Sequence, residues 1–170
     1  HFSTDCVFSG KTGNYKEADF ADSQDSYGRS KFYGEVQNEN TLVFRISVIG
    51  RELMTNRGLI EWFLQQQDVN GFLNAIFSGL PSVSIGNFII HYLTFCQRKT
   101  GLFHLSADPI SKYELLNIVN SRLGKEIKIN PTESPFINRS LNSNKLREEF
   151  GWHPKDWYQL VDEMCELQYD

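Results

Sequence analysis

The sequence has few cysteines and no long apolar run. Its three cysteines, Cys6, Cys96 and Cys165, are odd in number, far apart and without C-x-x-C spacing, so we expect neither a disulfide framework nor a zinc site. No apolar stretch approaches the roughly 20 residues of a membrane span, and the N-terminus lacks the basic and apolar regions of a signal peptide. These absences favour a cytoplasmic protein that binds neither membrane nor metal.

Positive charge is also scarce. The 17 Lys and Arg are scattered among 21 Asp and Glu, which gives a net charge of -4. This balance argues against a broad phosphate-binding surface, so nucleic acid is not an expected partner. The 170 residues are 40% hydrophobic and 14% aromatic. That composition suffices to bury a core in one domain or in a compact pair of domains.

One informative pattern of glycines is absent from the sequence. The chain contains no G-x-G-x-x-G or G-x-x-G-x-x-G, and Gly10 and Gly13 are only a fragment of such spacing. A glycine-rich turn between a first strand and a helix is what binds the pyrophosphate of a dinucleotide. The part of a protein that would carry such a turn is not expected in these 170 residues.

What is present alternates between strand and helix patterns. An apolar strand end at 1–8, a loop at 9–13, a helix at 25–37 and an apolar strand at 41–48 form the repeating unit of a parallel sheet. The spacing of apolar residues predicts further helices at 59–64, 83–97, 112–123, 144–150 and 157–167. Further strands are predicted at 101–106 and 126–130, with a strand or loop at 71–79 and a loop at 130–140. The chain is expected to be α/β.

Local signals fix some of these boundaries. Ser111-Lys112-Tyr113-Glu114 has the order of a capping box, which predicts a helix that begins at Lys112. Gly124 and Gly151 predict the ends of the helices before them. Ser143 and Asp156 are expected to cap the helices that follow them.

Tyr27 and Lys31 carry the first chemical signal. Four residues apart on a helix, they share one face, so the ammonium can lie near the phenol oxygen. A nearby cation favours the phenolate, which suits the phenol for general acid catalysis. Surface Tyr and Lys pairs have the same spacing, so this pair alone does not establish catalysis.

Ser3-Thr4-Asp5 carries the second signal. These residues follow the apolar start of a predicted strand, and open α/β sheets bind ligands outside the carboxyl ends of their strands. A hydroxyl in that place can donate to a substrate carbonyl oxygen. The alternative for Ser3 and Asp5 is a turn in which their side chains bond nearby backbone N–H groups.

Together these motifs resemble the extended short-chain dehydrogenases. S-T-D-C-V-F-S-G, a short loop and Y-G-R-S-K-x-x-G-E look like that family's catalytic stretch, with the closest likeness to sugar-nucleotide reductases typified by dTDP-4-dehydrorhamnose reductase. The likeness continues at 44–47, 74–80, 103–106 and 139–143. It implies the C-terminal part of a Rossmann-type doubly wound parallel sheet plus a small α/β substrate-binding subdomain. Residues 1–52 would be the Rossmann remnant, and 53–170 a mixed substrate-binding region with segments that return to the sheet.

The resemblance also implies a reaction and its residues. The reaction is reduction of a 4-keto-6-deoxy sugar nucleotide by NADPH or NADH, with Tyr27 as proton donor to the sugar C4 oxygen. Lys31 would tune Tyr27 and bind the nicotinamide ribose. Thr4 matches the catalytic hydroxyl, and Ser3 is the fallback. The remaining expected contacts are Ile46, Ser47 and Val48 with the nicotinamide, and Ser3, Asp5, Cys6, Val7, Phe8 and Asn74 with the sugar nucleotide.

The chain departs from the rhamnose-pathway members at two places. Cys6 and Val48 stand where those members often have large aromatic residues, which indicates a different sugar pocket. The form S-T-D-C-V-F-S-G resembles a branch that reduces UDP-linked 4-keto-6-deoxy-N-acetylhexosamines for surface polysaccharide synthesis. Because the glycine-rich turn is absent, we expect the 170 residues alone to bind dinucleotide poorly and to turn over little or nothing.

Two other functions remain open at this point. A non-catalytic binding subunit, such as the regulatory subunit of methionine adenosyltransferase, keeps related motifs without turnover. A sugar-nucleotide epimerase shares the fold and the Tyr and Lys pair. Dehydratases usually have T-D-E, whereas Thr4-Asp5 precedes Cys6 here, which argues against dehydration. Whether the chain forms a homodimer is also left open.

Overall fold

The computed structural model describes residues 1–52, 58–95 and 99–166. In these ranges strands and helices alternate, and almost every strand pair is parallel; the exception is one antiparallel pair, β5 with β8. The predicted α/β class is confirmed. No helix in these ranges is long and apolar enough to cross a membrane.

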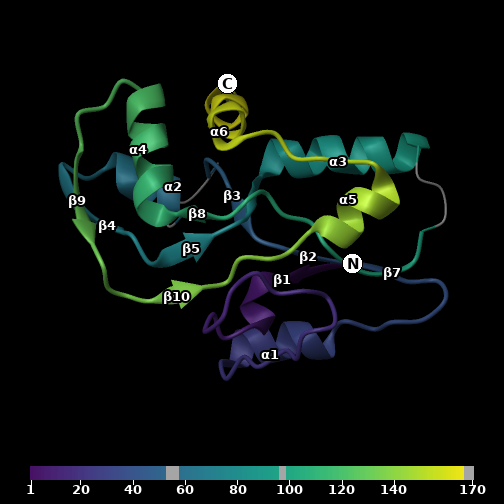
Figure 1. Cartoon of the computed structure of the whole chain (residues 1–170). Helices are drawn as coiled ribbons and strands as arrows, with labels where there is room; N and C mark the ends of the chain where they lie inside the picture. The colour runs from purple at the N-terminus through teal and green to yellow at the C-terminus, as the bar shows by residue number, and fades with distance from the viewer. Residues whose placement is uncertain (53–57, 96–98, 167–170) are drawn as a thin grey trace.

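The central sheet has three parallel strands in the order β1-β2-β7. They are β1 (Phe2–Thr4), β2 (Leu42–Ile46) and β7 (Gly101–His104). Helix α1 (Ser26–Tyr33) lies on one side of this sheet, and α3 (Ser82–Phe95) and α5 (Asn144–Phe150) lie on the other (Figure 1). Helices on both faces of a parallel sheet make it doubly wound, as the sequence predicts.

One part of the main core lies between the central sheet and the helices α3 and α5. Phe44 and Phe103 of the sheet meet Phe88 and Phe150 of these helices, with ring centroids 5.1 Å apart for Phe44 and Phe88 and 4.9 Å apart for Phe103 and Phe150. Both pairs have the edge-to-face geometry that aromatic rings favour. The side of the sheet that faces α1 has a much smaller apolar cluster, formed by Val7, Phe8, Tyr15 and Leu141.

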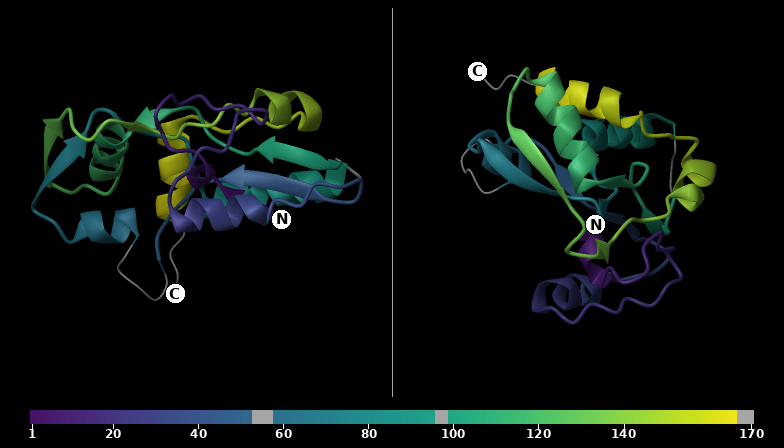
Figure 2. Two further views of the ribbon diagram at one scale, coloured as in Figure 1. Left: turned by 90° about the horizontal axis from the view of Figure 1, so that it is seen from below. Right: turned by 60° about the vertical axis from the view of Figure 1, so that its left-hand side comes forward.

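A second group of elements lies beside the central sheet (Figures 1 and 2). Strand β4 (Asp68–Phe72) pairs with β9 (Lys128–Thr132), and β5 (Ala75–Phe77) lies between β10 (Ile137–Asn138) and β8 (Ile110–Ser111). Its helices are α2 (Leu59–Leu64), α4 (Lys112–Arg122) and α6 (Trp157–Glu166). The short pair β3 (Val48–Ile49) and β6 (Leu80–Pro81) joins segments that follow β2 and β5.

Several local signals are confirmed. Ser111 and Glu114 form the complete capping box at the start of α4, and Gly151 ends α5 in the left-handed conformation with φ of 60°. The Asp156 side chain accepts from the backbone N–H of Gln159 at 2.9 Å. Ser143 precedes α5 but makes no side-chain cap, because its hydroxyl donates to the Ser106 carbonyl at 3.3 Å instead.

Some predicted boundaries are wrong. The strand predicted at 1–8 ends at Thr4, because the Thr4 side chain caps a 3-10 helix, η1 (Asp5–Val7). The helix predicted to reach residue 37 ends at Tyr33, and the predicted loop at 130–140 contains β10. Strand β9 lies two residues later than predicted, and 71–79 contains the end of β4 and all of β5. The helices predicted at 83–97 and 157–167 each end outside the described residues, and Cys96 also lies outside them.

Candidate active site

Thr4 and Asp5 form a turn at the carboxyl end of β1. The Thr4 hydroxyl accepts from the backbone N–H of Cys6 and donates to the Asp5 carboxyl, each at 3.2 Å. Both residues are buried, while Cys6 is half-buried. Burial raises the pKa of Asp5, although hydrogen bonds from Thr4 and Ser47 and the charge of Arg139 favour its ionised form. The turn therefore places a hydroxyl and a buried carboxyl where an open parallel sheet binds ligands.

Helix α1 carries Tyr27 and Lys31 across the start of β1. The Asp25 side chain caps the helix by accepting from the backbone N–H of Gly28 at 2.6 Å. The Lys31 ammonium donates to the Phe2 carbonyl at 2.8 Å, and the Tyr27 side chain is exposed. The predicted helix thus brings its cation to the strand that ends in Thr4, and it leaves the phenol accessible.

Gly28 explains how the helix approaches the turn so closely. A Cβ at Gly28 would lie 2.1 Å from the Cys6 carbonyl oxygen and 2.5 Å from the Ser23 hydroxyl. Only a glycine allows this contact between the backbones of α1 and η1. Tyr27 precedes Gly28 on α1, so this contact also fixes the backbone of the helix at Tyr27.

Ser3 and Thr4 have different environments although they are neighbours. The Ser3 hydroxyl is buried and donates to Glu35 at 2.5 Å. Glu35 in turn forms two hydrogen bonds with the Arg45 guanidinium, at 2.9 and 2.7 Å. The Ser3 hydroxyl is thus engaged by a buried ion pair, whereas the Thr4 hydroxyl bonds to Asp5 and Cys6 of its own turn.

The residues predicted to face the nicotinamide lie at the end of β2 and just after it. Ile46 is the Cα partner of Thr4 in the β1 and β2 register, so it lies at the same strand end. The Ser47 carbonyl accepts a hydrogen bond from the Leu80 N–H at 2.8 Å. The Ser47 hydroxyl hydrogen-bonds the Asp5 carboxyl and favours its ionised form. Val48 is 55% exposed, so an apolar side chain is accessible two residues beyond Ile46.

The remaining predicted sugar contacts are dispersed. Val7 and Phe8 are fully buried, and Phe8 stacks on Tyr15 with ring centroids 4.1 Å apart. Asn74 lies between β4 and β5 in the second group of elements, where its amide donates to the Glu133 carbonyl at 2.8 Å. Of the run from Cys6 to Phe8, only Cys6 has a partly exposed side chain.

Arg139 reaches the turn from a distant segment, and no role was predicted for it. Its Nε donates to the Phe8 carbonyl at 3.0 Å, and one terminal nitrogen contacts the Cys6 sulfur at 3.8 Å. The contact joins residues 131 positions apart. The sequence signal was the R-S-L-N-S stretch at 139–143, which carries a resemblance but no local pattern that shows where Arg139 lies.

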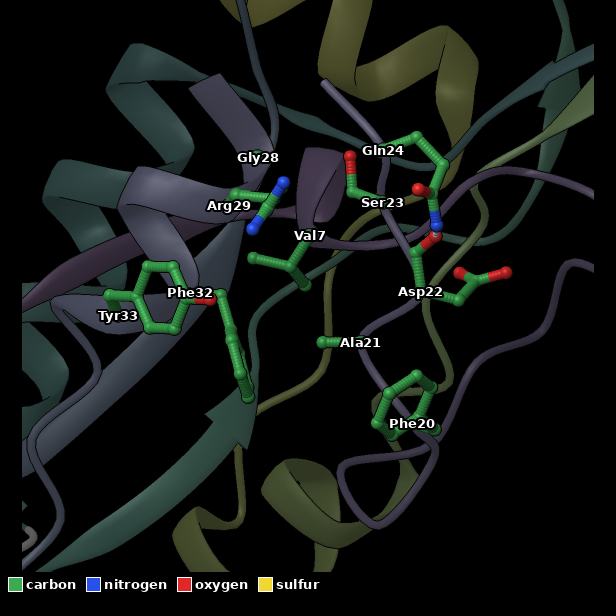
Figure 3. Close-up of a pocket in the computed structure, with 10 residues that line it drawn as sticks. All are labelled: Val7, Phe20, Ala21, Asp22, Ser23, Gln24, Gly28, Arg29, Phe32 and Tyr33. Atoms are coloured by element: carbon green, nitrogen blue, oxygen red, sulfur yellow. Dashed lines mark hydrogen bonds between the residues drawn. The ribbon is translucent and has the colours of Figure 1, made fainter. Parts of the chain in front are cut away.

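A pocket of about 340 Å³ flanks α1. Figure 3 shows Arg29, Phe32 and Tyr33 of α1 on one side, the 20–24 segment on the other, and Val7 between them. Neither Tyr27 nor Lys31 lines this pocket. Within the described residues, no group of three or more His, Cys, Asp or Glu side chains is placed to hold a metal ion.

Several solved structures share the fold of this chain. A hypothetical dTDP-4-dehydrorhamnose reductase from Sulfolobus tokodaii matches with a TM-score of 0.75 and 25% identity, over 92% of this chain and 60% of that one. The reductase from Bacillus anthracis in complex with NADP matches with a TM-score of 0.80 and 19% identity, over 97% and 64%. The Bordetella bronchiseptica enzyme WbmG in complex with NAD and UDP matches with a TM-score of 0.74 and 20% identity, over 96% and 57%.

The matches also show how much of each solved structure the chain covers. The chain spans about three fifths of the length of these solved structures. No curated protein sequence matches it. The family described as the RmlD substrate binding domain matches residues 1–169. With nearly the whole sequence matched, and with the doubly wound sheet shared with the solved reductases, the chain belongs to the RmlD substrate binding domain family.

Proposed function

We propose that this chain is the proton-transfer and substrate-binding part of a sugar-nucleotide 4-ketoreductase of the short-chain dehydrogenase type. The observation that carries the proposal is the packing of α1 on the Thr4–Cys6 turn through Gly28, with Lys31 bonded to the Phe2 carbonyl. In this proposal Tyr27, Lys31 and Thr4 supply the phenol, the ammonium and the hydroxyl that reduction of a carbonyl requires.

In the proposed reaction, Tyr27 donates a proton to the C4 oxygen of the sugar. Its exposure allows the substrate to reach the phenol, and Lys31 lies four residues further along the same helix. Thr4 donates a hydrogen bond to the same substrate oxygen. Its bond to Asp5, at 3.2 Å, is longer than a strong O–H···O bond, so the hydroxyl can turn to the substrate at little cost.

The residues present fit the nicotinamide end of a dinucleotide and not its pyrophosphate. Val48 offers an exposed apolar side chain beside Ile46 and Ser47, and Lys31 supplies the cation for a ribose hydroxyl. The glycine-rich turn that binds a pyrophosphate is not in this sequence. When bound, NADPH or NADH supplies the hydride for the carbonyl carbon. Residues 1–170 alone are therefore proposed to bind the cofactor poorly.

The proposed substrate is a UDP-linked 4-keto-6-deoxy-N-acetylhexosulose for surface polysaccharide synthesis. Cys6 and Val48 are smaller than the aromatic residues frequent in rhamnose-pathway members, and both are accessible at the strand ends. Smaller side chains leave room for a bulkier sugar substituent. Of the predicted sugar contacts, Cys6 and the turn's backbone fit this role better than the buried Val7 and Phe8.

The test joins residues 1–170 to a nucleotide-binding segment of the kind found in longer reductases. NADPH absorbance is followed with UDP-linked and dTDP-linked 4-keto-6-deoxy sugars. We expect NADPH consumption, preferentially with the UDP-linked sugar, and a loss of about 100-fold or more in Tyr27→Phe, because general acid catalysis contributes that much. Tyr33→Phe is the matched control on the same helix, and it should retain the parent activity.

The other outcomes either contradict the proposal or indicate a different function. If Tyr27→Phe matches the parent, Tyr27 is not the acid and the mechanism fails. Binding of the sugar nucleotide without NADPH consumption identifies a non-catalytic binding subunit. Interconversion of sugar epimers without net NADPH consumption identifies an epimerase. Ordinary affinity of residues 1–170 alone for NADPH, measured by calorimetry, contradicts the proposed dependence on a further segment.

A further inference from the structure

Helix α1 bears the proposed acid, yet very little apolar surface holds it in place. Of its eight residues only Gly28 is buried, and Tyr27, Phe32 and Tyr33 are exposed. A surface helix is ordinarily held by an apolar stripe that faces the core. Because α1 lacks such a stripe, its position on the sheet depends on polar contacts to an unusual degree.

The strongest of these polar contacts is made by Glu35, just after the helix. Glu35 accepts hydrogen bonds from the Ser3 hydroxyl at 2.5 Å and from Arg45 at 2.9 and 2.7 Å. The side chains of Glu35 and Arg45 are only 1% and 3% exposed. Their two parallel hydrogen bonds fix the planes of the carboxylate and the guanidinium, so the pair sets an orientation as well as a distance.

The network continues across the sheet to β7. The Arg45 guanidinium lies 3.4 Å from His104 Nε2, and since arginine only donates, Nε2 must accept. His104 Nδ1 therefore carries the proton and donates to the Tyr15 carbonyl at 3.0 Å. Burial, with the Arg45 charge as a second cause, lowers the pKa of His104 to about 3, so the ring is neutral. Within the described residues, every buried side-chain donor and acceptor has a partner.

The register of the strands places this network next to the proposed site. Ser3 precedes Thr4 on β1, and Arg45 precedes Ile46, the Cα partner of Thr4, on β2. Glu35 follows the end of α1 by two residues. The buried carboxylate thus joins the helix that bears Tyr27 to the two strands that flank the Thr4 hydroxyl.

We propose that the Glu35 and Arg45 ion pair, with Ser3, is a positioning device that fixes α1 on the strand end carrying Thr4. The inference rests on the proposed reductase function. A buried ion pair stabilises a fold no better than apolar groups of similar size, so stability does not explain its presence. Alignment of reacting groups does, because small displacements of a proton donor reduce turnover strongly. Ser3 is then a positioning residue, and Thr4 is the hydroxyl that touches the substrate.

The first test uses residues 1–170 and does not depend on activity. Hydrogen–deuterium exchange of α1 and α4 is compared in the parent, Ser3→Ala and the double variant Glu35→Gln/Arg45→Met, which removes both charges together and so avoids an unpaired buried charge. We expect α1 amides to exchange about 10-fold faster in the double variant and α4 amides to be unchanged. Glu149→Gln, which breaks the exposed pair with Lys99, is the control. Unchanged exchange in α1 overturns the proposal.

The second test measures turnover in the joined protein. For Ser3→Ala we expect kcat to fall about 10-fold with little change in KM, and for the double variant about 100-fold, because geometry and not substrate affinity is altered. Thr4→Val should lose more activity than Ser3→Ala. Equal losses in these two variants would make Ser3 a catalytic hydroxyl and overturn the assignment. If the parent is inactive, the reductase function fails, and the exchange experiment still decides whether the ion pair holds α1.

Discussion

The region around the proposed site and the region around β4 and β9 are held together in different ways. At the site, the contacts join residues far apart in the sequence and are buried: Ser3 with Glu35 is 32 positions apart, and Arg45 with His104 is 59. Around β4 and β9, the contacts of charged side chains are local or exposed. The capping box joins Ser111 to Glu114, and the ion pair of Asp68 and Lys128 lies at the surface.

This difference indicates in which region stability depends on charged side chains. Buried polar networks are strong when complete and costly when one partner is missing. Exposed pairs are screened by water and salt, and each contributes little. The site region should therefore respond sharply to single changes, whereas the β4 and β9 region should respond weakly to changes in its polar side chains.

The largest expected effect is at the contact between α1 and the turn. Gly28→Ala puts a Cβ 2.1 Å from the Cys6 carbonyl, so the backbone must move, and we expect a loss of about 3 kcal/mol in the free energy of unfolding. The matched control is Gly86→Ala in α3, where nothing lies within 4 Å of the new Cβ. There we expect a gain of about 0.5 to 1 kcal/mol, because alanine favours the helix.

Urea denaturation of both variants checks this prediction. Equal stabilities for Gly28→Ala and the parent would mean that α1 does not approach η1 as closely as described. In the joined protein, Gly28→Ala should also lower kcat, since the displacement moves Tyr27 away from Thr4.

The next effect is a dependence of stability on pH that arises from His104. The pKa of His104 is ordinarily 6.5 and about 3 in the folded chain. Between pH 3 and 6.5, the unfolded state therefore binds a proton at His104 and the folded state does not. The stability that depends on His104 is therefore fully present above about pH 7 and falls as the pH decreases toward 3. Between about pH 7 and 5 the contribution of His104 should fall by about 2 kcal/mol, because the slope approaches about 1.4 kcal/mol per pH unit below the unfolded pKa.

The measurement is the free energy of unfolding of the parent and His104→Gln at several pH values. Other groups titrate in both proteins, so the difference between the two curves isolates His104. That difference should change between pH 6.5 and 5 and stay constant above pH 7. Parallel curves over the whole range would show that His104 is not excluded from protonation in the folded state.

The two regions also differ in how well their structure could be predicted from the sequence. Signals that act within one turn, such as the Ser111 capping box and Gly151, were placed correctly because their hydrogen bonds join neighbours. The alternation of strand and helix predicted the α/β class for the same reason. The end of β1 was missed, since the Thr4 side chain caps η1 where its apolar neighbours favour a longer strand.

Long-range contacts could not be predicted from local patterns. Glu35 was visible in the motif that follows Lys31, but nothing nearby in the sequence shows that Arg45 is its partner. Arg139 is a still clearer case, because its contact with Phe8 spans 131 positions. The predicted site residues Thr4, Tyr27 and Lys31 do come from adjoining elements, while their catalytic roles stay a prediction.

A smaller effect is expected at the capping box of the β4 and β9 region. Ser111→Ala removes the hydroxyl that accepts from the Glu114 N–H at 3.1 Å, so we expect a loss of about 1 kcal/mol in the free energy of unfolding. Glu114→Gln keeps an acceptor oxygen for the Ser111 N–H and should change stability much less. Urea denaturation measures both variants, and a loss as large as that for Gly28→Ala would remove the proposed contrast between the regions.

The smallest effect is expected at the exposed ion pair of the same region. The side chains of Lys128 and Asp68 are 69% and 54% exposed and lie 3.1 Å apart, so water and salt screen their attraction. Lys128→Met should change the free energy of unfolding by less than about 0.5 kcal/mol. Raising the salt concentration should reduce even this change, because screening at about 1 M salt acts within about 3 Å. A larger, salt-insensitive loss in urea denaturation would show that the contrast between buried and exposed charges does not separate the two regions.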